Sequence, residues 1–178
     1  MAVHAFMDES ERDRRYYLCV AIVDQTQVNI MRKQLNCLLM PGQRELHFKQ
    51  EKPPRRRAVA DIIARLSVAV RIYQTTYTPR TDEIARQACL ELAVADLLEM
   101  GAHRLVIDSR AERDRLDGKT IRNLVPPDHP DHWNFSYEHS DSKLEPLCWI
   151  ADAAGWCFGA SGEWRRRIMP IIDDVIEL

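Results

Sequence analysis

The sequence predicts an α/β fold in which a central mixed sheet carries helices on both faces. Three observations lead to this prediction. Apolar, β-rich segments alternate along the chain with segments of helical periodicity, as in sheets that are covered on both sides. Residues 16–23 form one continuous apolar run, which is typical of a strand buried on both faces. The chain has 178 residues, 46% of them hydrophobic, so we expect a single domain spanning residues 1–178.

Turn and cap residues place the elements along the chain. Pro41 and Gly42 end the first helix, the proline pair at Pro53 begins the second, and Thr81 and Gly101 bound the third. About seven residues join the first two strands, too few for a parallel crossover, so these strands are expected to pair antiparallel. The first four strands should be central. Strands are predicted at residues 2–8, 16–23, 68–77, 104–108 and 133–139, with a short alternating segment at 45–49. Helices are predicted at residues 25–39, 53–66, 81–100, 111–123 and 147–158, and a shorter segment at 164–176 closes the chain.

The basic residues favour contact with nucleic acid, although the net charge of −2 gives no overall basic field. The chain has twenty arginines against five lysines. Arginine is the residue suited to bidentate contact with phosphate, but arginine groups are also common on solvated surfaces. The groups are Arg12/Arg14/Arg15, Arg55/Arg56/Arg57, Arg110/Arg113/Arg115 and Arg165/Arg166/Arg167.

Several classes of protein are excluded or disfavoured by the composition. No eighteen apolar residues run together, which excludes a membrane-spanning helix. The six glycines form no glycine-rich phosphate-binding loop, which excludes a P-loop nucleotide enzyme. The start of the chain has no basic region ahead of an apolar one, so we expect a cytoplasmic protein rather than a secreted one. The five cysteines include no CxxC pair and are expected to be buried, reduced thiols.

Acidic residues near the ends of predicted strands are the candidate functional residues. Asp8 and Asp108 each follow a buried apolar strand, and ligands of open α/β sheets bind at the carboxyl ends of strands. Glu45 and His47 are two positions apart, so on an extended segment they project from the same face. Asp152 lies in an apolar helix, where a carboxylate needs a cation or hydrogen bonds. Each acid has a turn, cap or ion-pair role as its alternative, but together these oxygen ligands suit Mg²⁺ or Mn²⁺.

Two motifs carry a resemblance to a known family. Phe6-Met7-Asp8-Glu9-Ser10, followed by the apolar strand 16–23 and by Glu45-Leu46-His47, resembles the first half of a bacterial family, domain of unknown function 3800 (DUF3800). Asp141-Ser142-Lys143, followed by the helix with Ala151-Asp152, is similar to its second signature. The chain departs from that pattern at Glu11, where the family has Gly, and at Cys148, where it has Gln.

The resemblance implies a ribonuclease-H-like three-layer fold and a nuclease that hydrolyses phosphodiester bonds of nucleic acid by a two-metal mechanism. A non-catalytic ribonuclease-H-like module that binds nucleic acid or protein is the alternative. A metal-assisted phosphatase or nucleotide hydrolase would use the same carboxylates. The implied ligands of Mg²⁺ or Mn²⁺ are Asp8, Glu45, Asp108 and Asp152, with His47 or Asp141 as substitutes for Glu45. Lys143 or His47 would contact the scissile phosphate or carry protons.

Overall fold

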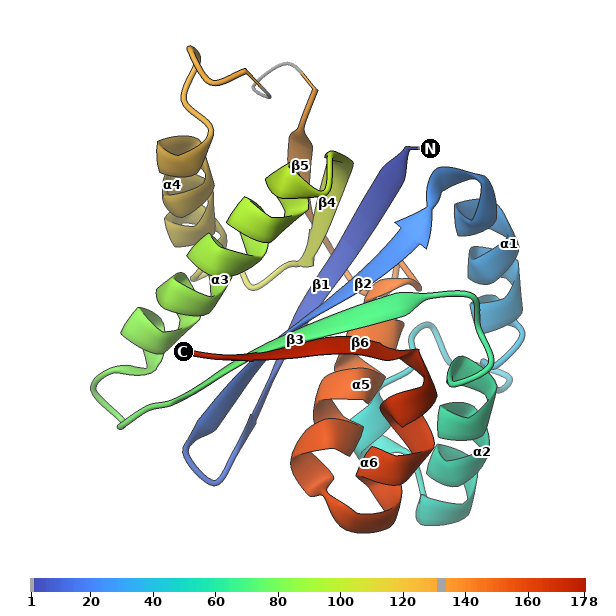
Figure 1. The fold of residues 1–178 in the computed structure, drawn as a ribbon. Coiled ribbons are helices and arrows are strands. Elements are labelled where there is room, and N and C mark those ends of the chain that lie inside the picture. Colours follow the sequence, from blue (N-terminus) through green and yellow to red (C-terminus); the bar gives the residue numbers. More distant parts are fainter. Residues whose placement is uncertain (1, 131–133) are drawn as a thin grey trace.

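The computed structural model describes residues 2–130 and 134–178, and in it six strands form one mixed sheet (Figure 1). The strand order is β5-β4-β1-β2-β3-β6. The pairs β1–β2 and β2–β3 are antiparallel, whereas β1–β4, β4–β5 and β3–β6 are parallel. The four strands that were predicted to be central are confirmed as the inner four. The strands are β1 (Val3–Arg12), β2 (Arg15–Asp24), β3 (Ala69–Thr76), β4 (Ala102–Asp108), β5 (Ser136–Ser140) and β6 (Ile172–Glu177).

Helices cover both faces of the sheet, as the sequence predicts. In Figure 1, α3 and α4 lie on one face, and α1, α2, α5 and α6 lie on the other. Each face has its own buried apolar cluster, because successive residues of β1 and β2 point to opposite sides: Phe6 and Cys19 contact one set of helices, and Met7 and Leu18 the other. The helices are α1 (Gln25–Asn36), α2 (Pro53–Ile63), α3 (Asp82–Glu99), α4 (Asp114–Leu124), α5 (Cys148–Ala160) and α6 (Gly162–Ile168), with 3₁₀ turns η1 (Phe48–Gln50) and η2 (Met169–Ile171).

The hairpin between β1 and β2 is tighter than predicted. Its turn consists of Asp13 and Arg14 alone, with φ angles of 51° and 61°, as the tightest hairpin turns require. β1 therefore continues to Arg12, and Asp8 lies inside the strand rather than at its end. The prediction of a strand at 2–8 was wrong here because residues 9–12, although polar, pair with β2 throughout.

Other predicted boundaries also differ from the structure. α1 ends at Asn36 because the chain turns at Cys37, and α4 begins at Asp114, three residues later than predicted. The segment 45–49 contains η1 instead of a strand. The closing segment contains the edge strand β6, whose charged residues concealed its pairing with β3. Ile62 is 40% exposed, because α2 turns it away from the sheet. The start of the predicted strand 133–139 lies outside the described residues.

All five cysteines are free, and four of them are buried as expected, whereas Cys37 is exposed just after α1. Among the described residues no helix is both long enough and apolar enough to cross a membrane.

Candidate metal centre

Small residues in the middle of α5 bring this helix close to β1 and β2. Gly155 lies so near the sheet that an added Cβ would be 2.9 Å from the Cβ of Ser10 and 3.0 Å from the Sγ of Cys19. Asp152 precedes Gly155 by three residues and therefore lies on the same helix face. The close approach thus brings the Asp152 carboxylate to the strand that carries Asp8.

The parallel pairing of β1 with β4 positions two further acids. Met7 pairs with Ile107, so Asp8 and Asp108 follow at neighbouring positions on adjacent strands. The four acids predicted as ligands and His47 line one cavity of about 30 Å³, enough for an ion or a water molecule. The lining residues are Asp8, Glu45, Leu46, His47, Asp108, Ser142, Cys148, Trp149 and Asp152.

Burial and mutual repulsion raise the pKa values of three of these acids. Burial, together with the charges of Asp152 and Asp108, raises the pKa of Asp8 well above its usual value. Burial raises the pKa of Asp108 to about 6, with Arg110 opposing the shift and Asp152 adding to it. Burial also raises the pKa of Asp152, although its carboxylate accepts a hydrogen bond from the Phe48 N–H at 3.1 Å. The cavity therefore favours a bound proton or cation over three bare carboxylates.

The loop after β5 holds the fourth acid in place. The Ser142 hydroxyl donates to the Glu45 carboxylate at 2.5 Å, and the Ser142 carbonyl accepts from the Trp149 indole at 2.8 Å. The Ser142 N–H donates to Asp108. Lys143 Nζ lies 3.8 Å from Glu45, at the edge of an adjoining groove of about 510 Å³. Asp141 lines that groove and not the cavity.

One arginine serves both faces of β1. Arg110 lies 3.7 Å from the Asp8 carboxylate and 2.6 Å from that of Glu9, the next residue, which points to the opposite face. Asp8 thus has a protein cation in its neighbourhood. Its only other polar contact among the described residues is the hydrogen bond from the Glu9 N–H, at 2.7 Å.

A buried ionic network beneath α3 and α4 was missed by the sequence reasoning. Arg86 is 4% exposed and binds the Asp117 carboxylate through two nitrogens, while its Nε donates to Glu9 at 2.8 Å. The Tyr16 hydroxyl also donates to Glu9. Burial alone would raise the pKa of Asp117, but hydrogen bonds from His139 and Arg86 outweigh it and hold this pKa below its usual range. An arginine in an amphipathic helix is ordinarily expected to be exposed, and no sequence signal distinguishes Arg86 from the others.

The tightest group of potential ligands in the described residues belongs to this network. Ligand atoms of Asp114, Asp117 and His139 all lie within 4.8 Å of one another. Arg86 already occupies both oxygens of Asp117, however, so this group is compensated without a metal. The acids around the cavity are farther apart, but they are all oxygen donors, and three of them have raised pKa values, which fits a hard divalent ion.

All three arginines of one predicted phosphate-binding group, Arg55, Arg56 and Arg57, already have protein partners. Arg55 pairs with Glu51 at 2.7 Å, and Arg57 pairs with Glu163 at 3.0 Å. Arg56 donates to backbone carbonyls of η1 and of Glu51, and its guanidinium lies over the Trp156 ring. These contacts hold the start of α2 against the neighbouring segments, so the first role of this group is structural.

The sheet order and the layer of helices on each face define an α/β protein with a ribonuclease-H-like fold, as predicted. Among solved structures, the chain is similar to ribonuclease HII of Archaeoglobus fulgidus, determined in complex with PCNA. The TM-score is 0.54 with 14% identity, and the match covers 95% of this chain and 86% of that chain. The sequence matches no protein-family model, and no curated protein matches it. The structural likeness establishes the fold.

Proposed function

We propose that the protein is a nuclease that requires Mg²⁺ or Mn²⁺ and hydrolyses phosphodiester bonds of nucleic acid by a two-metal mechanism. The observation that carries the proposal is the cavity at which Asp8, Asp108 and Asp152 converge with raised pKa values. Similarity in fold to a ribonuclease supports the same class of chemistry by analogy. We also propose membership of the DUF3800 family, from the two motifs, and a cytoplasmic location, which five free cysteines favour.

The proposal gives each side chain a task. Asp8, Glu45, Asp108 and Asp152 would hold the ions. Divalent ions so held lower the pKa of a bound water and offset charge on the phosphate and the leaving oxygen. The Ser142 hydroxyl fixes the orientation of Glu45, and the Phe48 N–H that of Asp152.

Two basic side chains at the rim would serve the substrate. Lys143 is 42% exposed beside Glu45, and His47 is exposed where the cavity meets the neighbouring grooves. Both can reach a phosphate that spans the cavity, or exchange protons with solvent.

The test is metal binding followed by cleavage. We expect calorimetry to detect Mn²⁺ binding to the wild type and not to Asp8→Asn, because an amide of the same shape is a much weaker ligand than a carboxylate. The control is Asp128→Asn, which is exposed in a loop and should bind as the wild type does. With Mn²⁺, the wild type should cleave at least one of single-stranded, duplex and hybrid polynucleotides, and Asp8→Asn none. Intact substrates in every case would refute the nuclease.

The second candidate is a binding module without catalysis. Arg110 favours it, because a cation beside Asp8 can substitute for a metal. In that case Mn²⁺ would not bind, and a polynucleotide would bind equally with chelator.

A further inference from the structure

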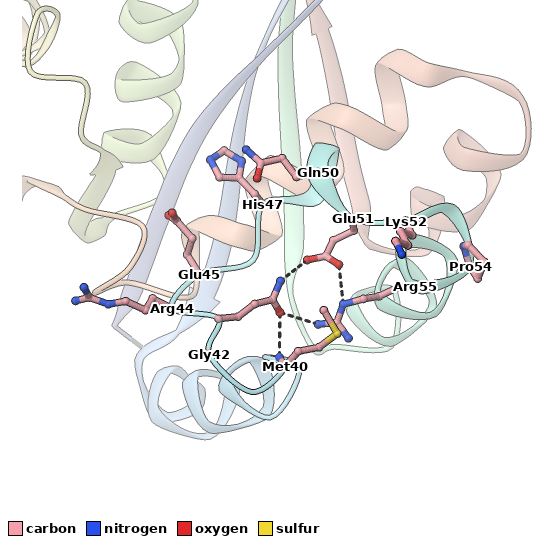
Figure 2. Close-up of a pocket in the computed structure, with 11 residues that line it drawn as sticks. Met40, Gly42, Arg44, Glu45, His47, Gln50, Glu51, Lys52, Pro54 and Arg55 are labelled. Carbon is pink, nitrogen blue, oxygen red and sulfur yellow. Dashed lines mark hydrogen bonds and ion pairs between the residues drawn. The ribbon is translucent and has the colours of Figure 1, made fainter.

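A second, larger pocket opens beside the acidic cavity. It has a volume of about 760 Å³ and is formed by the segment between α1 and the start of α2, within residues 40–55 (Figure 2). Glu45 and His47 line both this pocket and the acidic cavity, so the two spaces share a wall. A ligand unit in the pocket would therefore lie next to whatever occupies the cavity.

The floor of this pocket is fixed by a closed hydrogen-bond network, drawn as dashed lines in Figure 2. Glu51 is only 6% exposed, and it accepts from Gln43 Nε2 at 2.8 Å and from Arg55 Nε at 2.7 Å. The Gln43 side-chain oxygen in turn accepts from the Met40 N–H at 2.9 Å. Because the buried carboxylate is satisfied, the loop is held in shape without a ligand, and binding needs little further ordering.

The mouth of the pocket, in contrast, carries uncommitted polar groups. In residues 2–130 and 134–178 the side chains of Arg44, Gln50 and Lys52 make no hydrogen bond or ion pair, and all three residues are exposed. Apolar surface lies beside them: Met40 is 46% exposed, and Pro54 is also exposed. Free cations suit phosphate, an amide suits the edge of a base, and apolar surface suits its face.

We infer that this pocket binds one nucleotide of a single-stranded segment, the unit adjacent to the phosphate at the acidic cavity. The inference rests on the proposed function for what the cavity holds, but binding in the pocket can be measured without metal. Arg44 and Lys52 would contact the backbone, and the base would lie against Met40 with Gln50 at its edge.

The experiment measures binding of a labelled single-stranded octanucleotide by fluorescence anisotropy, with chelator present so that nothing is cleaved. Met40→Glu introduces an anionic side chain of similar size, and we expect the Kd to rise about tenfold or more, through lost apolar contact and repulsion of phosphate. Its control is Ile84→Glu, at an exposed apolar residue on the opposite face of the sheet, whose Kd should stay within about twofold.

A second pair of variants gives a different readout. Lys52→Gln should reduce the slope of log Kd against log salt concentration by about 0.7, the value for one phosphate contact with a single strand. Lys119→Gln, on α4, should leave that slope unchanged.

Three outcomes are decisive. If the wild type does not bind the octanucleotide, or if Met40→Glu and Lys52→Gln bind as the wild type does, the inference is overturned. If these variants lose binding but the wild type with Mn²⁺ cleaves nothing, the inference that the pocket binds a nucleotide is supported and the nuclease proposal fails. If the wild type cleaves and both variants bind normally, the nuclease proposal stands and the pocket inference fails.

Discussion

Replacing Asp108 with Asn should stabilise the metal-free protein at neutral pH. The pKa of Asp108 is about 6 in the folded state, against 3.8 for the free side chain, a difference of about two units. Each unit corresponds to about 1.4 kcal/mol, so the ionised carboxylate costs the fold at most about 3 kcal/mol near pH 7.5. Because Asp108 is only partly buried, solvent screening reduces this to about 1–2 kcal/mol. The melting temperature should therefore rise by about 2–8 °C.

The pH dependence fixes the sign of this effect. A carboxyl group with a raised folded pKa binds more protons when folded, so the wild type loses stability as the pH rises from about 4 to 6. The gain from Asn should thus be full above about pH 6 and vanish below about pH 4. Asn keeps an acceptor oxygen for the Ser142 N–H, so that hydrogen bond survives.

Thermal melts in chelator at several pH values provide the assay, with Asp128→Asn as the control at an exposed acid. Added Mn²⁺ should stabilise the wild type and reverse the order of the two proteins, because only the wild type keeps the full ligand set. An Asn variant that melts below the wild type near pH 7.5, or a gain that is the same at every pH, would refute the reasoning.

Three other predictions concern the supports of the site. Arg86→Met should destabilise the fold by about 3–5 kcal/mol in urea melts, because it removes the arginine partner of the buried Asp117 carboxylate. The control is Arg104→Met, at a partly exposed arginine paired with an exposed Glu138, which should cost less than about 1 kcal/mol; equal losses would contradict the argument. A change from Gly to Ala usually favours a helix, but in Gly155→Ala the new Cβ would meet the Ser10 Cβ. We therefore expect the free energy of unfolding to fall by about 1–3 kcal/mol and calorimetry to show weaker Mn²⁺ binding. An increase in stability would show that α5 can accommodate the added methyl group. Because the pKa of Asp117 is lowered in the folded protein, its ionised carboxylate stabilises the fold above about pH 4, and this stability is lost as the pH falls through the folded pKa. Asp117→Asn should remove this part of the acid dependence when denaturation is measured at several pH values. A stability profile against pH that is unchanged by Asp117→Asn would contradict the argument.

The elements that the sequence predicts well are those whose burial shows in the residues themselves. The apolar run at 16–23 and the apolar helix around Asp152 became β2 and α5 with boundaries within two residues. Asp108 was placed correctly because the apolar segment of β4 stops at it. Local patterns of this kind are enough to predict the layers of strands and helices and to position two of the candidate ligands, Asp108 and Asp152.

The parts that could not be predicted depend on distant residues. β1 extends past Asp8 only because β2 offers polar residues 9–12 a pairing partner. β6 forms because β3 has a free edge, which its own charged residues do not reveal. Glu9 is buried because Arg86, 77 positions away, meets it beneath α3. Such pairings arise from the tertiary fold and leave no periodic pattern in the sequence.

The opposite directions of Asp8 and Glu9 have a consequence for how β1 aligns with β2. Ala5, Phe6 and Met7 are all buried, as are residues 16–21, so a slip of one residue would still bury apolar side chains on both faces. Such a slip would move Glu9 into the cavity. Replacing Glu9 with Leu and Arg86 with Met removes the ion pair and keeps the volume filled, and Asp117→Asn added to them avoids leaving the other buried partner of Arg86 charged. Doubled amide resonances along β1 would then reveal the second alignment. A single set would show that the turn alone prevents it. Since a buried ion pair adds little net stability, we infer that the pair between Glu9 and Arg86 serves to select which of two adjacent acids faces the cavity.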